Sequence, residues 1–336
     1  KLAIAPTVSI VITCVTGVIT STLFRSINVW FFICLELAIP VFVLVASFVW
    51  RCAGSVQMSA GSRSGYLNTK DVGFHQVLYL VVGFIAAIYV FVSVLGSPEY
   101  FSVSIDNSYH LNEIHAIATT GCYSPVGISV YPTVPGYGST AAGFYPAAWH
   151  VICALVCNVL SVSAAVAINA VNFTFVAFVF PMGCFAFLSV IAKKKTCLAL
   201  GALVCISAYT FPWRLLTFGV LYSNLAAFCL VCSVCSVFMC LTSGESPSIQ
   251  ERLLLSILFI VGLIDLFLLQ PNGVFSVGVL MLPYAVSRLY AFCVARNLSP
   301  FKSIAAASGL FVCFVIAWIV AYNLPMMRGV VGVSWN

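Results

Sequence analysis

The stretch from Asn28 to Trp50, NVWFFICLELAIPVFVLVASFVW, decides the fold class of this chain. About 20 apolar residues, rising about 1.5 Å each, are enough to cross the hydrocarbon layer of a membrane as a helix. The one ionisable residue in the stretch is Glu36. A carboxyl group at that depth adds about 2.5–3.5 kcal/mol to insertion, and such groups face a bundle interior or a water path. We interpret Glu36 as a proton or ion site; the alternative is a glutamate facing a polar neighbouring helix.

The composition extends this interpretation to the whole chain. Hydrophobic residues make up 62% of the 336 residues, charged residues only 7%, and the mean hydropathy is +1.14. Such a chain has too few charges to cover the surface of a soluble domain, so it is predicted to be an all-α, polytopic transmembrane bundle. The polar intervals are too short for a soluble catalytic domain. The net charge of +6 comes from basic residues at the ends of apolar runs, which does not indicate nucleic-acid binding.

Hydropathy predicts about eleven transmembrane helices within one integral-membrane domain covering residues 1–336. The predicted spans are 2–24, 28–50, 72–95, 110–130, 141–161, 166–192, 196–211, 215–241, 253–270, 274–290 and 303–322. The doubtful one is 110–130, because it contains His110, Glu113, His115 and Pro125.

The distribution of Lys and Arg favours a model in which the doubtful segment crosses the membrane. Eleven spans place eleven basic residues on one side of the membrane and three on the other, whereas omitting only this segment gives six against eight. The larger group is Lys1, Arg51, Arg63, Lys70, Lys193, Lys194, Lys195, Arg252, Arg288, Arg296 and Lys302; the smaller is Arg25, Arg214 and Arg328. The positive-inside rule therefore predicts that 110–130 spans, with the N-terminus on the positive side.

Several polar side chains then lie within the membrane and are candidates for a proton path. They are Glu36, Glu113, His115, His150 and Asp265, with Lys193, Lys194 and Lys195 at one rim. Carboxyl and imidazole groups in a bundle can pass protons along ordered water. The alternative for each histidine is a packing residue with a satisfied hydrogen bond. No catalytic residue, metal ligand or cofactor ligand is predicted, and the cysteines are expected to be buried small apolar residues.

The order of several segments is similar to that of NADH dehydrogenase subunit 2, a membrane-arm subunit of mitochondrial respiratory complex I related to cation/proton antiporters. WFFICLELAIPVF, beginning at Trp30, resembles the second-helix pattern of that family, and DVGFHQVLYLVVGF, beginning at Asp71, resembles the next helix. TTGCYSPVGISVYPTVPGYGST, AAWHVICAL and KKKTCLAL resemble, in order, its Gly-Pro turn, its Trp-Gln-Lys segment and its basic helix start. The collinearity covers about residues 2–240.

The resemblance implies an antiporter-like membrane-arm subunit that contributes to proton translocation coupled to NADH:ubiquinone oxidoreduction. It implies the mitochondrial inner membrane with the N-terminus in the matrix, neighbouring membrane-arm subunits and bound lipids as partners. NADH, FMN, iron–sulfur clusters and ubiquinone would lie elsewhere in the complex, with no redox centre in this chain.

The positions of the family lysines are a departure from this pattern. The positions that correspond to these lysines are Thr120, Val151 and a position near Asn272, so the lysines are missing here. Of the charged residues typical of the family, only Glu36 is carried over. Either His115 and His150 substitute for the lost lysines, or proton transfer is impaired. Two other classes remain open, a structural membrane subunit without its own proton path and a stand-alone secondary transporter.

Overall fold

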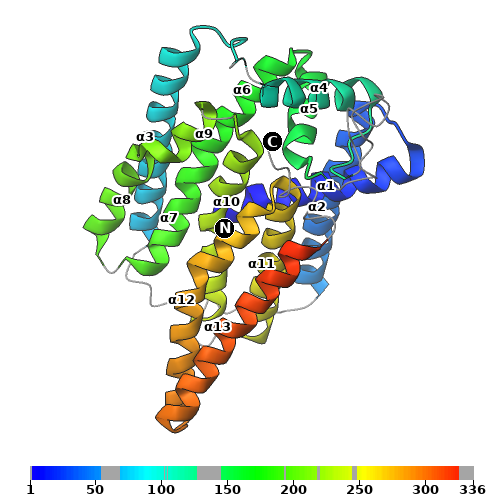
Figure 1. The fold of residues 1–336 in the computed structure, drawn as a ribbon. Coiled ribbons are helices and arrows are strands. Elements are labelled where there is room, and N and C mark those ends of the chain that lie inside the picture. The colour runs from blue at the N-terminus through cyan, green and yellow to red at the C-terminus, as the bar shows by residue number, and fades with distance from the viewer. Residues whose placement is uncertain are drawn as a thin grey trace.

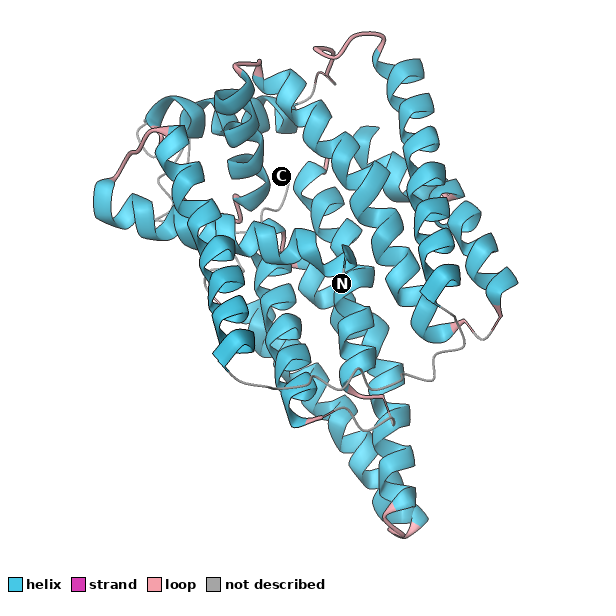
Figure 2. Cartoon of the chain, turned by 180° about the vertical axis from the view of Figure 1, so that it is seen from behind, coloured by secondary structure: helices cyan, strands magenta, loops and turns pink. Residues whose placement is uncertain are grey.

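A computed structural model describes residues 2–53, 69–101, 103, 105–126, 145–192, 194–217, 220–243 and 248–324. Within these ranges the chain consists of helices joined by turns, with no strand (Figures 1 and 2). The helices are η1 (Leu2–Ile4), α1 (Ala5–Phe24), α2 (Val29–Ala53), α3 (Thr69–Leu95), α4 (Ile105–Thr120), α5 (Ala148–Leu160), α6 (Ala164–Thr174), η2 (Phe175–Val179), α7 (Phe180–Ile191), α8 (Lys195–Ser207), η3 (Tyr209–Trp213), α9 (Arg214–Thr217), α10 (Tyr222–Leu241), α11 (Ile249–Leu269), α12 (Asn272–Ala295) and α13 (Pro300–Asn323).

The predicted all-helical, polytopic architecture is confirmed. Eight helical stretches in the described part are long and apolar enough to cross a membrane. They are α1 with its preceding η1 turn, α3, the continuous α6–η2–α7, the continuous α8–η3–α9, α10, α11, α12 and α13. The predicted eleven spans also included the regions of α2, α4 and α5, which are not among these eight.

The predicted span over 110–130 is not a single helix. Helix α4 begins earlier, at Ile105, and ends at Thr120, where Gly121 adopts the left-handed backbone conformation (φ 65°). Sixteen residues of α-helix extend only about 24 Å, less than the hydrocarbon layer. The segment is also polar, because its first turns carry Asp106, His110 and Glu113. Helix α5 has 13 residues and is shorter still.

Helix α10 lies at the centre of the bundle. It packs most extensively against α7 and α11, and it also contacts α12, α5 and η2. Helix α3 packs on α7, α8 and η2, while α13 packs against α12, and these two form the hairpin at the lower end of the molecule in Figure 1. Helices α4 and α5 pack against each other at the opposite end of the bundle (Figure 1).

Helix α1 has the inverse of the amphipathic pattern of a soluble protein. Its buried face carries hydroxyl groups, whereas its exposed face carries large apolar side chains. The buried hydroxyls belong to Thr7, Thr13, Thr16 and Thr20. Since lipid solvates the apolar face, this polar face must point into the protein. Helix α1 packs against α11, α2 and α5, so its hydroxyl groups face the interior beneath α5.

Candidate functional site

One face of α4 gathers the first set of titratable side chains. Asp106, His110 and Glu113 are spaced at i, i+4 and i+7, which aligns them along one side of an α-helix. Glu113 is completely buried and His110 is 7% exposed, whereas Asp106 is half-buried. The buried face continues with Ile114 and Ile117, which attach α4 to the core. The polar residues therefore lie toward the N-terminal end of α4.

Helix α5 supplies the second histidine. The amide of Ala147 donates to the Pro125 carbonyl (3.1 Å), which fixes the start of α5 against the segment that follows α4. His150 then lies in the first turn of α5, fully buried. Its Nε2 is 2.8 Å from Nδ1 of His110, and Nε2 of His110 is 3.2 Å from the Val220 carbonyl oxygen. The chain segment before α10 is thus joined to α4 and α5 through two imidazole rings.

The hydrogen bonds determine which tautomers the histidines adopt. The Val220 carbonyl only accepts, so His110 carries its proton on Nε2 and accepts on Nδ1 from Nε2–H of His150. Nδ1 of His150 is then a lone-pair acceptor. It is buried and has no hydrogen-bond partner among the described residues. The chain of bonds therefore ends at a nitrogen atom whose lone pair is not engaged by a donor among the described residues.

Burial determines the charge of both rings. Burial lowers the pKa of His110 to about 4, although the hydrogen bond to the Val220 carbonyl partly opposes this shift. The pKa of His150 also lies well below its usual value, first because of burial and then because of the neighbouring His110. Both histidines are consequently neutral near pH 7.

Aromatic rings enclose the histidine pair. Trp149 and Tyr222 lie 5.4 and 5.6 Å from the His110 ring centre, and Tyr145 lies 5.6 Å from that of His150. Trp149 is held by its Nε1–H, which donates to Asn172 on α6 (3.2 Å). Burial, followed by the negative charges of Glu113 and Asp106, raises the pKa of the Tyr145 phenol. Tyr145 therefore lies within electrostatic reach of both carboxyl groups, and we name Asp106, His110, Glu113, Tyr145 and His150 the α4–α5 cluster.

A second set of carboxyl groups surrounds α1. Thr13 of α1 donates its hydroxyl hydrogen to Oε1 of Glu36 on α2. Asp265 of α11 is completely buried on another side of α1, near Thr7. Cys14 lies within electrostatic reach of both Glu36 and Asp265. Helix α5, which carries His150 of the α4–α5 cluster, contacts α1, α2 and α11, the helices that surround this carboxyl pair.

The structure brings some of the predicted site residues together and separates others. Glu113 and His150 belong to one cluster, and Glu36 and Asp265 flank one helix. His115 is exposed and does not belong to the buried face of α4. Lys194 and Lys195 are exposed at the start of α8, at the end of α7 away from α4 (Figure 1). Lys193 lies outside the described residues.

Sequence reasoning missed three members of the α4–α5 cluster. His110, Asp106 and Tyr145 were not chosen as site residues. The i, i+4, i+7 spacing of Asp106, His110 and Glu113 is the signal that would have selected the first two. It would also have excluded His115, which lies two positions after Glu113. No comparable pattern marks Tyr145, which approaches α4 only through the tertiary fold.

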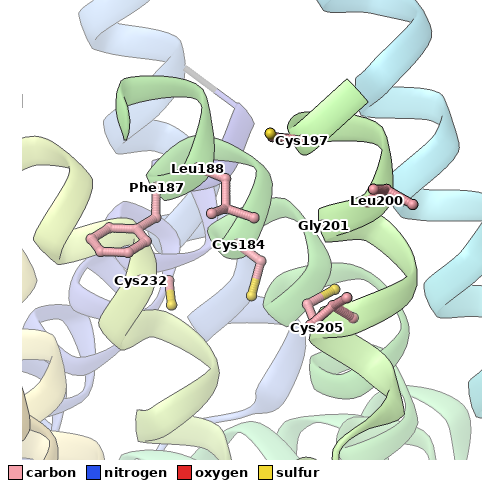
Figure 3. A pocket seen from close by; sticks show the side chains of 9 residues that line it. Cys184, Phe187, Leu188, Cys197, Leu200, Gly201, Cys205 and Cys232 are labelled. Carbon is pink, nitrogen blue, oxygen red and sulfur yellow. The ribbon is translucent and has the colours of Figure 1, made fainter. Parts of the chain in front are cut away.

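Cysteine side chains line a cavity elsewhere in the bundle. The cavity, about 370 Å³ in volume, lies between α7, α8 and α10, where the thiols of Cys184, Cys205 and Cys232 meet apolar side chains such as Phe187 and Leu188 (Figure 3). The fourteen cysteines whose side chains the structure describes are free thiols, and Cys34, Cys197 and Cys313 are exposed rather than buried. Across the described ranges, no group of three or more His, Cys, Asp or Glu residues is arranged to hold a metal ion.

Comparison with known proteins finds a family whose model matches the chain. The model of a family of unknown function, DUF6541, matches residues 1–336. No curated protein and no solved structure matches the chain.

Proposed function

We propose that this chain, which belongs to the DUF6541 family of unknown function, is a multi-pass membrane protein that moves protons, with the α4–α5 cluster as its proton-accepting end. The observation that carries the proposal is the acceptor nitrogen of His150, which terminates the chain of bonds from Val220 through His110. A proton arriving at Nδ1 of His150 can be relayed to His110 through their shared hydrogen bond. Ionisable side chains inside membrane bundles most often mark such routes.

The second set of carboxyl groups supports a continuation of this route into the bundle. Helix α5 contacts α1, α2 and α11, which carry Thr13, Glu36 and Asp265. The buried hydroxyl face of α1 provides groups that both donate and accept hydrogen bonds, as a proton relay needs. Helix α1 thus offers a polar surface that connects the two carboxyl groups.

A more specific form of the proposal follows from the resemblance to NADH dehydrogenase subunit 2. In that form the chain is an antiporter-like membrane-arm subunit of respiratory complex I in the mitochondrial inner membrane, with eleven spans and the N-terminus in the matrix. This form needs α4 and α5 to cross the membrane, and their 16 and 13 residues are short for a crossing.

A second candidate function is acid–base catalysis at one face of the membrane. The observation that favours it is the same shortness of α4 and α5, which puts the cluster at the end of the bundle rather than along its length. There, neutral His150 would act as a general base toward a hydroxyl group of a membrane-bound substrate, in the same cluster as the half-buried Asp106. In this case protons would pass to a substrate and not across the membrane.

Proton flux into sealed proteoliposomes separates the two functions. We expect the protein to acidify vesicles containing a trapped pH dye when a pH gradient is applied. His150→Gln keeps an N–H donor for His110 but removes the accepting Nδ1, so the flux should fall by roughly tenfold or more, the scale of a lost acid–base group. His115→Gln changes an exposed histidine of the neighbouring helix α4 and should leave the flux unchanged. A wild-type flux equal to that of empty vesicles would overturn proton transport and leave the catalytic function.

A further inference from the structure

The cavity between α7, α8 and α10 begins at a membrane boundary and follows α8 inward (Figure 3). Helix α8 contributes Cys197, Gly201 and Cys205 to its lining, and their spacing of i, i+4 and i+8 places them on one side of the helix. Cys197 lies in the first turn of α8, where the candidate span Lys195–Thr217 begins, and Cys205 lies in its last turn. At about 1.5 Å per residue, the cavity is about 12 Å long in this direction.

One side of this cavity opens toward lipid. Leu200 and Val204, which also line it, are 60% and 67% exposed, whereas Cys184 of α7 is buried on the inner side. The lining has no charged group and no hydroxyl or amide side chain that could hold water, and apolar cavities stay dry. In a membrane an acyl chain fills such a cavity, because its contacts replace the dispersion energy that an empty cavity loses.

Positive charge marks the outer end of the cavity. Lys194 and Lys195 are exposed, three and two residues before Cys197, and Lys193 precedes them in the sequence. Between Glu113 and Glu245 the sequence contains no Asp or Glu, so this part of the chain carries positive charge only. Lysine binds phosphate as a point charge, and runs of basic residues at a membrane boundary attract anionic headgroups. The lipid that fits this position is therefore anionic.

We propose that the cavity between α7, α8 and α10 binds one anionic phospholipid. One acyl chain lies along α8 inside the cavity, and the phosphate group lies at the membrane boundary beside Lys194 and Lys195. The chain then becomes part of the packing among the three helices, since it supplies contacts that the protein leaves open. The site goes beyond the proposed proton transport and does not depend on it.

Photo-crosslinking in lipid nanodiscs tests the site. The probe is phosphatidylglycerol with a diazirine in one acyl chain, present as a small fraction of a phosphatidylcholine bilayer, and peptide mass spectrometry locates the cross-links. We expect a higher yield on Leu200 and Val204 than on Ile316 and Ile319, which are exposed apolar residues of α13. Unlabelled phosphatidylglycerol at about ten times its half-saturating amount leaves about a tenth of the sites free, so the cavity yield should fall roughly tenfold.

Two outcomes of this experiment would count against the proposal. Equal yields on the cavity and on α13 would show only lipid that surrounds the whole bundle, and would overturn the site. The same competition by added phosphatidylcholine would overturn the assignment to an anionic headgroup.

Lysine variants test the headgroup contact. Changing both Lys194→Gln and Lys195→Gln should raise the half-saturating amount of phosphatidylglycerol roughly 25-fold, about fivefold for each charge. Lys302→Gln removes an exposed lysine at the start of α13 and should leave it unchanged. An equal effect of Lys302→Gln would contradict the specific role of the two lysines.

Cysteine variants test the position of the acyl chain. Cys205→Phe places a ring in the cavity and should remove the cross-links that unlabelled phosphatidylglycerol competes away. Cys313→Phe changes an exposed position of α13 and should preserve them. Undiminished cross-links in Cys205→Phe would show that the chain does not lie in the cavity. The experiment needs no proton gradient, so absent proton flux with intact lipid binding would contradict only the proposed transport, and the reverse result only the lipid site.

Discussion

At the scale of single residues, His110 is the group whose charge most directly links pH to the stability of the fold. Both ring nitrogens of His110 are engaged, one with His150 and one with the Val220 carbonyl. Protonating His110 would add a second N–H facing the donor of His150, and it would place a charge in a buried site. The folded state therefore requires the neutral form of His110.

The pKa of His110, about 4 in the fold and about 6.5 in an unfolded chain, predicts a stability that falls with acid. Between these values the unfolded state binds the extra proton, so stability is complete above about pH 6.5 and is lost as the pH falls toward 4. The loss should be on the order of 3 kcal/mol. His110→Gln should weaken the pH dependence of the unfolding midpoint in detergent and leave the part that comes from His150, whose pKa burial also lowers, whereas His115→Gln should leave it as in the wild type. A pH dependence in His110→Gln as steep as that of the wild type would contradict the assignment.

At the scale of secondary-structure elements, α3 and the α6–η2–α7 helix show how close packing depends on one small residue. Pro181 cannot donate a backbone hydrogen bond, and the π-helical turn η2 comes just before it. Gly83 of α3 packs there: a Cβ atom at Gly83 would lie 2.6 Å from the Ala177 carbonyl oxygen. Gly73 lies earlier in α3, and a Cβ atom added to Gly73 would meet no neighbouring atom within 4 Å.

Alanine at these two glycines should have opposite effects. Removing a glycine from a helix interior favours folding by about 1 kcal/mol, so Gly73→Ala should slightly raise the unfolding midpoint in detergent. Gly83→Ala gains the same term but pushes α3 away from η2 and Pro181, an overpacking that costs about 1–3 kcal/mol. Its midpoint should therefore fall below that of Gly73→Ala. If both variants shift in the same direction by the same amount, α3 does not depend on this close approach.

The element scale also separates what the sequence can predict from what it cannot. Long apolar runs predicted the spans well, because a helix in lipid must satisfy its own backbone and has no competing structure. The predicted bounds of the helix at 110–130 were wrong, because α4 begins at Ile105 and ends at Thr120. Asp106, His110 and Glu113 lie along one side of this 16-residue helix, where His110 and Glu113 are buried. The pairing of His110 with His150, and of Asp265 with Thr7, joins positions far apart in the chain and could not be inferred from spacing within one element.

At the scale of the whole molecule, the charge asymmetry does not require α4 to cross the membrane. If a predicted helix does not cross the membrane, every later connecting segment moves to the opposite side. Treating α4 alone as non-crossing therefore removes the charge asymmetry. Removing α4 and α5 together restores it, because two reversals cancel. The eight candidate spans and α2 therefore give the same eleven-to-three distribution of basic residues as eleven spans do. The positive-inside rule fixes only whether the number of skipped crossings is even.

The location of the segment between α4 and α5 distinguishes the two arrangements. Asn169 of α6 donates to the carbonyls of Pro98 and Tyr100, which ties the start of α6 to the connection that leads from α3 to α4. If α4 and α5 lie at that end without crossing, an epitope tag inserted at Ser97 and one inserted between residues 132 and 138 should be accessible from the same side of sealed membranes. If each crosses, the tags should be on opposite sides, and co-purification with an NADH-oxidising complex becomes the expected result. Tags on the same side together with such co-purification would support the association with the complex and contradict the eleven-span topology. The chain would then be part of the complex with α4 and α5 at one membrane face.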